Sequence, residues 1–251
     1  MRRAYLLPNL FTSASLFCGI LALISVYRGN LMGAYWLILL GIVLDSLDGK
    51  IARLTNTQSL FGLNYDSLSD LVTFGVAPGI LLFVHLISAG VKEGVAAGVV
   101  SLYILCGAIR LARFNVISMH KPSFTFVGLP IPAAAGIVVT TLAVFHNLNP
   151  VFTLKGLPLV IVAMAYLMVS QVKYPSGKNI HLDINEIVLL VTVGIAIFWL
   201  LQPFRDILIF ACFWSYLLFG VIQHSVVQVM NLQRADEIPG EEIEEEEETE
   251  I

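Results

Sequence analysis

Long apolar runs recur along most of this chain, and they constrain its fold more than any other feature. Each run is too long for a strand, and the hydrocarbon core of a bilayer, about 30 Å thick, needs about 20 apolar residues in a helix. Hydrophobic residues make up 57% of the chain and charged residues 13%, about half the charged share of a typical soluble domain. Because lipid offers no partner to backbone polar groups, only helices or closed barrels can span it. We therefore predict an all-α fold, a polytopic transmembrane helical bundle.

The apolar pattern predicts about eight spans, with six as a minimum because the sixth and seventh are the weakest. The spans are Pro8–Tyr27, Met32–Thr55, Gly62–Ala89, Gly94–Ser118, Leu129–His146, Gly156–Gln171, Glu186–Leu201 and Ile207–Met230. We expect the first to be kept as a span rather than cleaved as a signal, since it is long and no clear small-residue cleavage site follows it.

The formal charge of −4 is set by one segment at the end of the sequence. Ten of the eighteen acidic residues lie between Asp236 and Glu250, so the rest of the chain carries fourteen basic and eight acidic side chains. A Glu-rich segment with few apolar residues cannot bury enough surface to fold. We predict a transmembrane domain over residues 1–235, which holds all the candidate site residues, and an acidic, disordered cytosolic tail over residues 236–251.

Basic residues indicate how the bundle is oriented. With an even number of spans and a cytosolic N-terminus, ten basic residues fall at cytosolic ends and four at the opposite ends, which is the bias that membrane proteins show. The ten are Arg2, Arg3, Lys50, Arg53, Arg110, Arg113, Lys121, Lys173, Lys178 and Arg234, and the four are Arg28, Lys92, Lys155 and Arg205. We therefore predict a multi-pass protein of the cell membrane with both termini in the cytosol.

Four aspartates interrupt the apolar helices: Asp45, Asp48, Asp66 and Asp70. A charge at the centre of a membrane helix costs about 2.5–3.5 kcal/mol even on the lenient insertion scale, and four like charges also repel. At about 100° per residue, the first two aspartates share a face of the second helix and the last two share a stripe of the third. The connection at residues 56–61 makes these helices antiparallel neighbours, so two aspartates can face two. Since Asp45 lies about 13 Å from the helix end, we expect a cavity near the cytosolic face.

A set of carboxylates without a nearby His or Cys favours Mg²⁺ or Mn²⁺ over zinc. Four carboxylates suit two divalent cations, a pair that commonly holds the attacking and leaving oxygens in phosphoryl transfer. Gly49, Ala52 and Gly62 leave room for a ligand on the same faces. Arg53 can pair with a phosphate and Ser59 can donate to one. A structural hydrogen-bonding role for the aspartates and a cation transporter stay open as alternatives.

The spaced residues form the pattern Asp45-x2-Asp48-Gly49-x2-Ala52-Arg53-x8-Gly62-x3-Asp66-x3-Asp70. At every fixed position this pattern resembles the signature of the CDP-alcohol phosphatidyltransferases. Within that family, four segments resemble the phosphatidylserine synthases: Pro8–Thr12, Asp66–Pro78, Arg110–Asn115 and Gly128–Gly136. The resemblance covers about Pro8 to Gly136, while the last three spans match in hydrophobic character only.

The resemblance implies an enzyme that transfers the phosphatidyl group of CDP-diacylglycerol, or of its archaeal counterpart CDP-archaeol, to L-serine and releases CMP. It implies that the four aspartates hold two divalent cations on the diphosphate and that Asp70 is also the general base. The residues implied to line the CDP moiety are Gly49, Ala52, Arg53, Ser59 and Gly62. The family resemblance further implies a homodimer in membrane lipid, and nothing in the sequence indicates a nucleic-acid partner.

A serine acceptor requires a cation or a set of donors for its carboxylate in a partly desolvated pocket. Arg110, Arg113 and Asn115 are the candidates, and anchoring at the cytosolic face is the alternative for the two arginines. Asn9 and Thr12, at the start of the first span, are candidates for a phosphate contact, although a helix N-cap explains Asn9 equally well.

Three rival functions remain compatible with the sequence. The nearest is a member of the same family that accepts glycerol 3-phosphate, inositol, inositol phosphate or choline. A second is an intramembrane prenyltransferase, which also binds a diphosphate through aspartate-bound metal. The third, from a different class, is the cation transporter.

Overall fold

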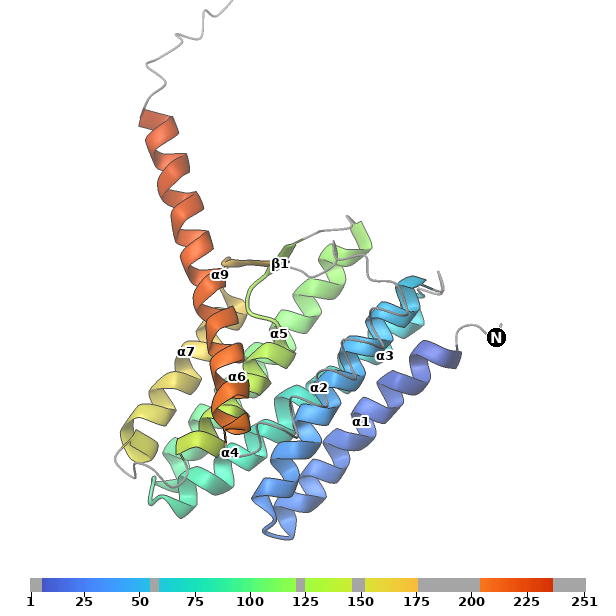
Figure 1. Cartoon of the computed structure of the whole chain (residues 1–251), viewed down its shortest axis with the longest axis vertical. Helices are drawn as coiled ribbons and strands as arrows, with labels where there is room; N and C mark the ends of the chain where they lie inside the picture. The colour runs from blue at the N-terminus through green and yellow to red at the C-terminus, as the bar shows by residue number, and fades with distance from the viewer. Residues whose placement is uncertain (1–5, 55–58, 121–124, 146–151, 176–203, 237–251) are drawn as a thin grey trace, which may run out of the picture.

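The structure is a computed structural model that describes residues 6–54, 59–120, 125–145, 152–175 and 204–236. It is a bundle of helices (Figure 1). The α-helices are α1 (Leu6–Tyr27), α2 (Leu31–Leu54), α3 (Leu60–Asp70), α4 (Ala77–Ser88), α5 (Glu93–His120), α6 (Ile131–Phe145), α7 (Leu157–Val169) and α9 (Arg205–Asp236). Two π-helices, η2 (Leu71–Val76) and η3 (Phe152–Gly156), join α3 to α4 and lead into α7. Two short strands are β1 (Thr125–Val127) and β2 (Lys173–Pro175).

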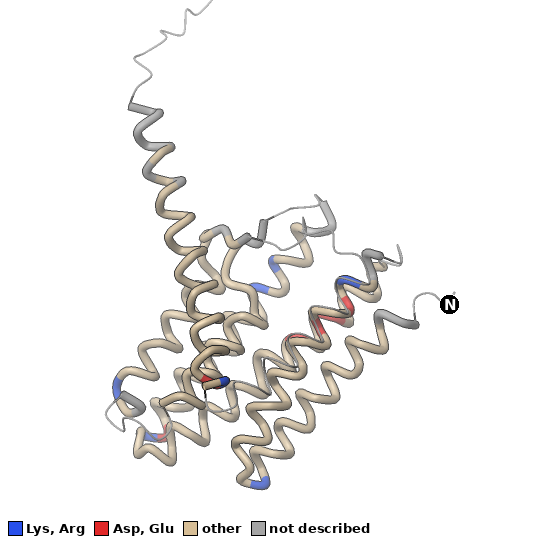
Figure 2. Tube along the Cα trace, viewed as in Figure 1, with Lys and Arg blue, Asp and Glu red and all other residues tan. Residues whose placement is uncertain are grey.

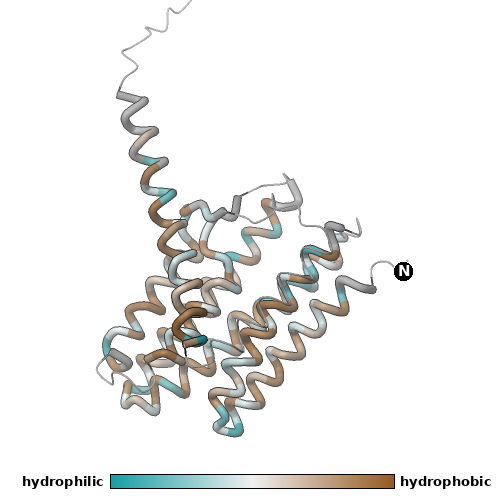
Figure 3. The backbone as a smooth tube through the Cα atoms, in the orientation of Figure 1, coloured by the Kyte–Doolittle hydropathy of each residue, from teal (hydrophilic) through white to brown (hydrophobic). Residues whose placement is uncertain are grey.

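Within the described residues, five helical segments are long and apolar enough to cross a membrane: Asn9–Tyr27, Leu31–Ile51, Leu60–Ser88, Glu93–Ile117 and Arg205–Val226. Hydrophobic colouring runs along the length of these helices in Figure 3. Large apolar side chains also point outward, for example Phe17, Leu40 and Leu105, as expected where lipid covers the bundle. The prediction of a polytopic helical membrane bundle is confirmed.

The count of eight spans stays a prediction. The fifth and sixth predicted spans correspond to shorter apolar helices, Ile131–Phe145 and Leu154–Val169. The seventh, Glu186–Leu201, lies outside the described residues, as do residues 237–251 of the predicted acidic tail. The last helix, α9, runs to Asp236, six residues beyond the end predicted for the eighth span.

The third span is one continuous helix, α3–η2–α4, with a π-helical segment at its centre. In an α-helix the carbonyl of Phe74 would accept from the N–H of residue 78, and Pro78 has none. The hydroxyl of Tyr103, from α5, donates to the Phe74 carbonyl at 2.8 Å. Tyr103 and Phe74 are both fully buried. The irregular turn, which begins directly after Asp70, is therefore stabilised by a neighbouring helix.

Helices α1, α2 and η2 approach closely around Thr73. A Cβ added at Gly19 of α1 would lie 2.7 Å from Thr73 Oγ1, and one added at Gly41 of α2 would lie 2.8 Å from Thr73 Cγ2. The Thr73 hydroxyl donates to the Ser15 carbonyl at 3.2 Å, and the Ser15 hydroxyl donates to the Gly41 carbonyl at 3.1 Å. Small residues and interhelical hydroxyl bonds of this kind hold membrane helices together.

The two strands form an antiparallel ribbon, with Thr125 opposite Pro175. The all-α prediction misses this ribbon because three residues give no recognisable strand period. Gly128 follows β1 with φ +83°, and an added Cβ would lie 2.3 Å from the Met168 carbonyl oxygen. Only glycine fits both the left-handed backbone and this contact, so the chain after β1 lies directly on the end of α7.

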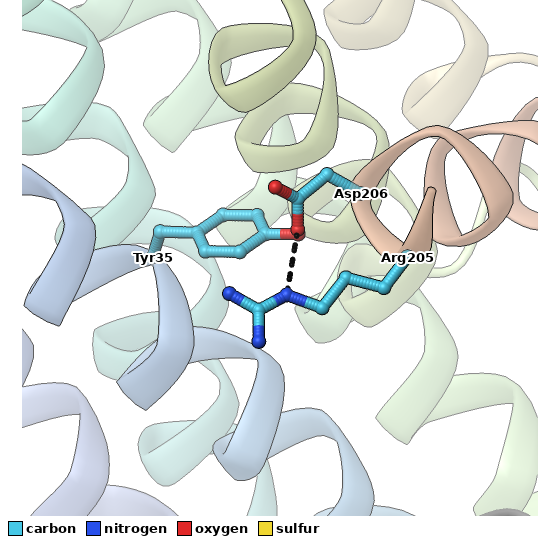
Figure 4. Close-up of polar contacts among 3 residues, drawn as sticks. All are labelled: Tyr35, Arg205 and Asp206. Carbon is cyan, nitrogen blue, oxygen red and sulfur yellow. Dashed lines mark hydrogen bonds and ion pairs between the residues drawn. The ribbon is translucent and has the colours of Figure 1, made fainter. Parts of the chain in front are cut away.

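Helix α9 is attached to α2 at the end of the bundle where α2 begins. Arg205 Nε lies 3.5 Å from Asp206 Oδ1, and the Tyr35 hydroxyl donates to the same oxygen at 3.5 Å (Figure 4). The Arg205 guanidinium also lies over the Trp36 ring, 4.4 Å from its centroid. Asp206 and the aromatic face together offset the positive charge of Arg205, which is unfavourable at a helix N-terminus.

Candidate active site

Carboxylates from α2 and α3 meet between these helices. One oxygen from each of Asp45, Asp48 and Asp66 lies within 4.8 Å of the other two. Figure 2 shows a run of acidic residues on α2 and α3, and further acidic residues at the starts of α5 and α9. Asp48 is buried, and Asp45 and Asp66 are partly buried. Three carboxylates at this separation can bind a divalent cation through oxygen, the donor that Mg²⁺ and Mn²⁺ prefer.

Asp70, the last residue of α3, completes the group. It is 8% exposed and interacts electrostatically with Asp45, Asp66 and Arg110. Oδ1 of Asp66 and Oδ1 of Asp70 are buried and accept no hydrogen bond from the described residues. A buried carboxylate oxygen without a donor is costly. The free oxygens and the all-carboxylate donor set therefore fit bound metal ions.

Helix α1 supplies hydroxyl groups to this cluster. The Thr12 hydroxyl donates to Asp48 Oδ2 at 2.6 Å, and the Ser69 hydroxyl donates to the Thr12 carbonyl at 3.1 Å. The hydroxyl of the next residue, Ser13, shares a hydrogen bond of 2.9 Å with that of Tyr65, one turn before Ser69 in α3. The Thr12 hydroxyl therefore contacts a carboxylate in this structure, whereas the sequence suggested that Thr12 contacts a phosphate. Ser13 and Tyr65 carry no motif that would have drawn attention to them.

The residues expected around the CDP moiety lie near the ends of α2 and α3. Ser59 is the N-cap of α3, and its hydroxyl oxygen accepts from the Gly62 N–H at 3.0 Å. A Cβ added at Gly62 would lie 3.2 Å from Ser59 Oγ and 3.6 Å from Asn9 Oδ1. Gly49 follows Asp48 in α2 and is partly buried. The structure therefore brings Asn9, Ser59 and Gly62 together beside the aspartates.

The other two expected CDP contacts are Ala52 and Arg53. Ala52 and Arg53 belong to the last turn of α2, but their side chains lie outside the part of the chain that the structure describes.

The two arginines of α5 have different surroundings. Arg110 is 5% exposed, interacts electrostatically with Asp70 and Asp45, and lies 5.6 Å from the centroid of the Phe114 ring. It also interacts electrostatically with Arg113 and with Tyr216 of α9.

Arg113, one turn further along α5, donates to backbone carbonyls. Its Nη1 bonds Val169 at 2.8 Å, and its Nη2 bonds Val127 at 2.9 Å and Ser170 at 3.2 Å. These bonds tie α5 to β1 and to the end of α7, which leaves Arg110 as the arginine that faces the aspartates.

Asn115 forms a polar bridge between α5 and α3. It accepts from the Ser67 hydroxyl at 3.0 Å and donates to Asn64 Oδ1 at 3.4 Å. These three residues line one part of a cleft of about 320 Å³, whose other lining residues are Leu68, Leu71, Ala108, Leu111 and Ala112. The cleft therefore joins a polar mouth to an apolar wall between α3 and α5, and none of the four aspartates lines it. Asn64 and Ser67 were not among the residues singled out from the sequence.

Comparison with known proteins identifies the class to which this fold and site belong. The CDP-alcohol phosphatidyltransferase family model matches residues 5–197. The chain belongs to the CDP-alcohol phosphatidyltransferase family. This finding confirms the resemblance carried by the aspartate pattern and sets aside the prenyltransferase and transporter alternatives.

Curated relatives are similar over much of their length. A CDP-diacylglycerol–serine O-phosphatidyltransferase of Helicobacter pylori is 36% identical over 223 residues, covering 87% of this chain and 91% of that protein. One of the same name from Bacillus subtilis is 36% identical over 173 residues, or 69% of this chain and 92% of that protein. An archaetidylserine synthase of Methanothermobacter thermautotrophicus is 38% identical over 172 residues, 67% and 69% of the two chains.

Proposed function

We propose that this chain transfers the phosphatidyl group of CDP-diacylglycerol, or of its ether-lipid counterpart CDP-archaeol, to the hydroxyl of L-serine and releases CMP. The observation that carries the proposal is the meeting of three carboxylates within 4.8 Å, next to Asp70 and a buried arginine. The names of the relatives from bacteria and archaea support both serine and the two lipid types.

Asp45, Asp48, Asp66 and Asp70 would hold two divalent cations, Mg²⁺ or Mn²⁺. When bound, the cations supply the positive charge that offsets the four carboxylates and the diphosphate of the nucleotide lipid. The Thr12 hydroxyl, 2.6 Å from Asp48 Oδ2, orients that carboxylate, as outer-shell groups commonly do for metal ligands.

Asp70 would be the general base. It takes the hydroxyl proton of serine as the serine oxygen bonds to the lipid-side phosphorus and the bond to CMP breaks. Arg110 places a positive charge near this carboxylate.

The CDP moiety would lie along the cytosolic ends of α2 and α3. Gly49, Ala52 and Gly62 would leave space for it, while Arg53 and Ser59 would contact its polar groups. A Cβ added at Gly62 would lie 3.2 Å from Ser59 Oγ, so a larger residue at 62 would crowd this expected CDP contact.

The serine carboxylate would pair with Arg110. Arg113 already donates to the carbonyls of Val127, Val169 and Ser170, so its guanidinium is committed to holding helices together. Among the described side chains, Arg110 is the arginine that interacts with the aspartates, and its single charge suits a carboxylate better than the two charges of glycerol 3-phosphate. Asn115 would shape the neighbouring cleft.

Lipid tails would enter sideways through that cleft between α3 and α5. Leu68, Leu71 and Leu111 supply its apolar wall, while nucleotide and serine reach the polar mouth from water. We further propose that the site faces the cytosol, that both termini lie there, and that the enzyme is a homodimer, as the family resemblance implies.

The test is CMP release by the purified protein in lipid nanodiscs that contain CDP-diacylglycerol. CMP and phosphatidylserine should form with L-serine, stop after chelation of divalent cations, and return with Mg²⁺ or Mn²⁺. The Asp70→Asn variant should lose at least about a hundredfold in rate. A parallel sample with CDP-archaeol compares the two lipid types. The serine assignment would be overturned if glycerol 3-phosphate or inositol supported CMP release and serine did not.

A further inference from the structure

Helix α9 lies beyond residues 5–197, the part of the chain that the family model matches, yet it is fixed tightly to the bundle. The Phe213 ring of α9 fills the space over Gly136 of α6, where an added Cβ would lie 2.2 Å from the ring. Next to it, the Trp214 Nε1–H donates to the Thr141 hydroxyl at 3.1 Å. These contacts set the rotation of α9 about its own axis.

A second glycine contact joins α9 to β2. A Cβ added at Gly220 would lie 2.2 Å from the Tyr174 ring, so the glycine lets this ring lie flat on the helix. The Tyr174 ring in turn stacks on Tyr216 of α9, with ring centroids 5.8 Å apart and planes at 29°. The position of Tyr216 is therefore set from both sides, by its own helix and by the ring of Tyr174.

Tyr216 extends this arrangement to the candidate active site. It interacts electrostatically with Arg110, the arginine that also faces Asp70 and Asp45. The Tyr174 hydroxyl is buried and has no hydrogen-bond partner among the described residues. Burial and the nearby Tyr216 raise the pKa of Tyr174 to about 12, so its phenol stays protonated at neutral pH and can donate a hydrogen bond to an acceptor.

A buried guanidinium beside a phenol hydroxyl recognises a carboxylate well. The guanidinium supplies the charge, and the phenol donates a hydrogen bond to a carboxylate oxygen in surroundings where water competes little. We propose that Tyr216 is a specificity-determining residue that works with Arg110 to bind the carboxylate of an amino-acid acceptor, and so makes α9 part of the acceptor subsite. This inference rests on the proposed function and adds the residue that selects the acceptor.

The test compares Tyr216→Phe with Tyr166→Phe in the full-length protein in nanodiscs. Tyr166 lies on α7 and is 72% exposed, so it serves as the matched control. Tyr216→Phe keeps the ring stacked on Tyr174 and removes only the hydroxyl. We expect the KM for L-serine to rise about tenfold, the size of one lost charge-assisted hydrogen bond, while kcat and the KM for CDP-diacylglycerol stay within about twofold.

Ethanolamine, which is serine without its carboxylate, separates a binding role from a structural one. The wild-type preference for serine over ethanolamine, measured as the ratio of kcat/KM values, should fall about tenfold in Tyr216→Phe. A general loss of packing would lower both kcat/KM values and leave that ratio unchanged. An unchanged ratio together with an unchanged serine KM would overturn this inference while wild-type CMP release with serine still stood. Failure of the wild-type enzyme to use serine would instead refute the proposed function itself.

Discussion

Thr12 of α1 forms a direct hydrogen bond with one of the four aspartates, Asp48. Its hydroxyl donates to Asp48 Oδ2 at 2.6 Å, and its own carbonyl accepts from Ser69, so it is held from both sides. Replacing Thr12 by valine keeps the shape and removes the donor. We expect the Mg²⁺ concentration for half-maximal CMP release to rise about tenfold, as is typical when an outer-shell partner of a metal ligand is lost.

A Mg²⁺ titration of each variant checks this prediction. Thr12→Ser keeps the hydroxyl and should behave like the wild-type enzyme. If Thr12→Val altered the KM for CDP-diacylglycerol but not the Mg²⁺ dependence, a direct phosphate contact by Thr12 would be the better explanation.

Arg110 and Arg113 allow a paired prediction, since they differ in surroundings and share a helix. Arg110→Gln should raise the KM for L-serine about 10- to 100-fold, because a charged donor to the carboxylate is lost. Arg113→Gln should leave that KM near the wild-type value and lower the stability by about 1–3 kcal/mol, because the carbonyls of Val127, Val169 and Ser170 lose their donor. Serine kinetics and thermal unfolding in detergent give the two readouts. The reverse outcome would move the carboxylate contact to Arg113.

The sequence predicted the residues whose spacing carries information. The four aspartates and Gly62 follow helical periodicity, so their meeting can be anticipated from two neighbouring helices. Thr12 on Asp48 and Tyr216 beside Arg110 involve residues far apart in the chain, and no periodicity links them. The two arginines, Arg110 and Arg113, look alike in the sequence because both lie near the predicted cytosolic end of the same span. Only the contacts to α7 and β1 distinguish them.

At the scale of elements, Thr73 is the point where α1, α2 and η2 touch. The close contacts predict that Gly41→Ala destabilises the bundle by about 1–3 kcal/mol through overpacking. The added methyl would meet Thr73 Cγ2 at 2.8 Å, an atom that serine lacks. The double variant Gly41→Ala/Thr73→Ser should therefore regain most of the lost stability.

Gly19→Ala is the matched comparison for that rescue. Its added methyl would meet Thr73 Oγ1 and the Thr73 Cα, at 2.7 and 2.8 Å, and both atoms persist in serine. Thr73→Ser should not rescue Gly19→Ala. Thermal unfolding of the four variants in detergent measures the effect, and equal rescue of both glycine variants would contradict the geometry.

Hydropathy predicted where most helices lie but not how they depart from regularity. The first span was expected at Pro8–Tyr27 and is helical over Leu6–Tyr27. The π-helix after Asp70 was not expected, because it depends on Pro78 lacking an N–H and on a hydroxyl from α5 reaching Phe74. The ribbon of β1 and β2 was not predicted for a related reason. Contacts of Gly128 and Arg113 stabilise it, and its own residues show no strand pattern.

At the scale of the whole molecule, the distribution of Lys and Arg residues predicts which end of the bundle faces the cytosol. Described side chains alone do not give a strong bias. Three basic residues lie on the part of the bundle that carries the aspartates (Lys50, Arg110 and Arg113), whereas four lie at connections or helix starts of the opposite end (Arg28, Lys92, Lys155 and Arg205). Arg205 is also paired with Asp206, which weakens its influence. The predicted orientation depends on seven more basic residues whose side chains lie outside the described part of the chain, so it calls for a direct measurement. They are Arg2, Arg3, Arg53, Lys121, Lys173, Lys178 and Arg234.

Two exposed lysines at opposite ends of the bundle make that measurement possible. Lys50 lies in the last part of α2, near the aspartates, and Lys92 lies between α4 and α5 at the other end. In a background where Cys18, Cys106 and Cys212 are replaced by alanine, the thiol introduced by Lys92→Cys should react with a membrane-impermeant maleimide in intact cells. The thiol introduced by Lys50→Cys should react only after the membrane is permeabilised, because the positive-inside bias places that end in the cytosol. Retained CMP release in both variants would verify the fold. Labelling of position 50 in intact cells would place the site on the outer face, where cytosolic nucleotide lipid and serine could not reach it, and would refute the orientation on which the supply of substrates depends.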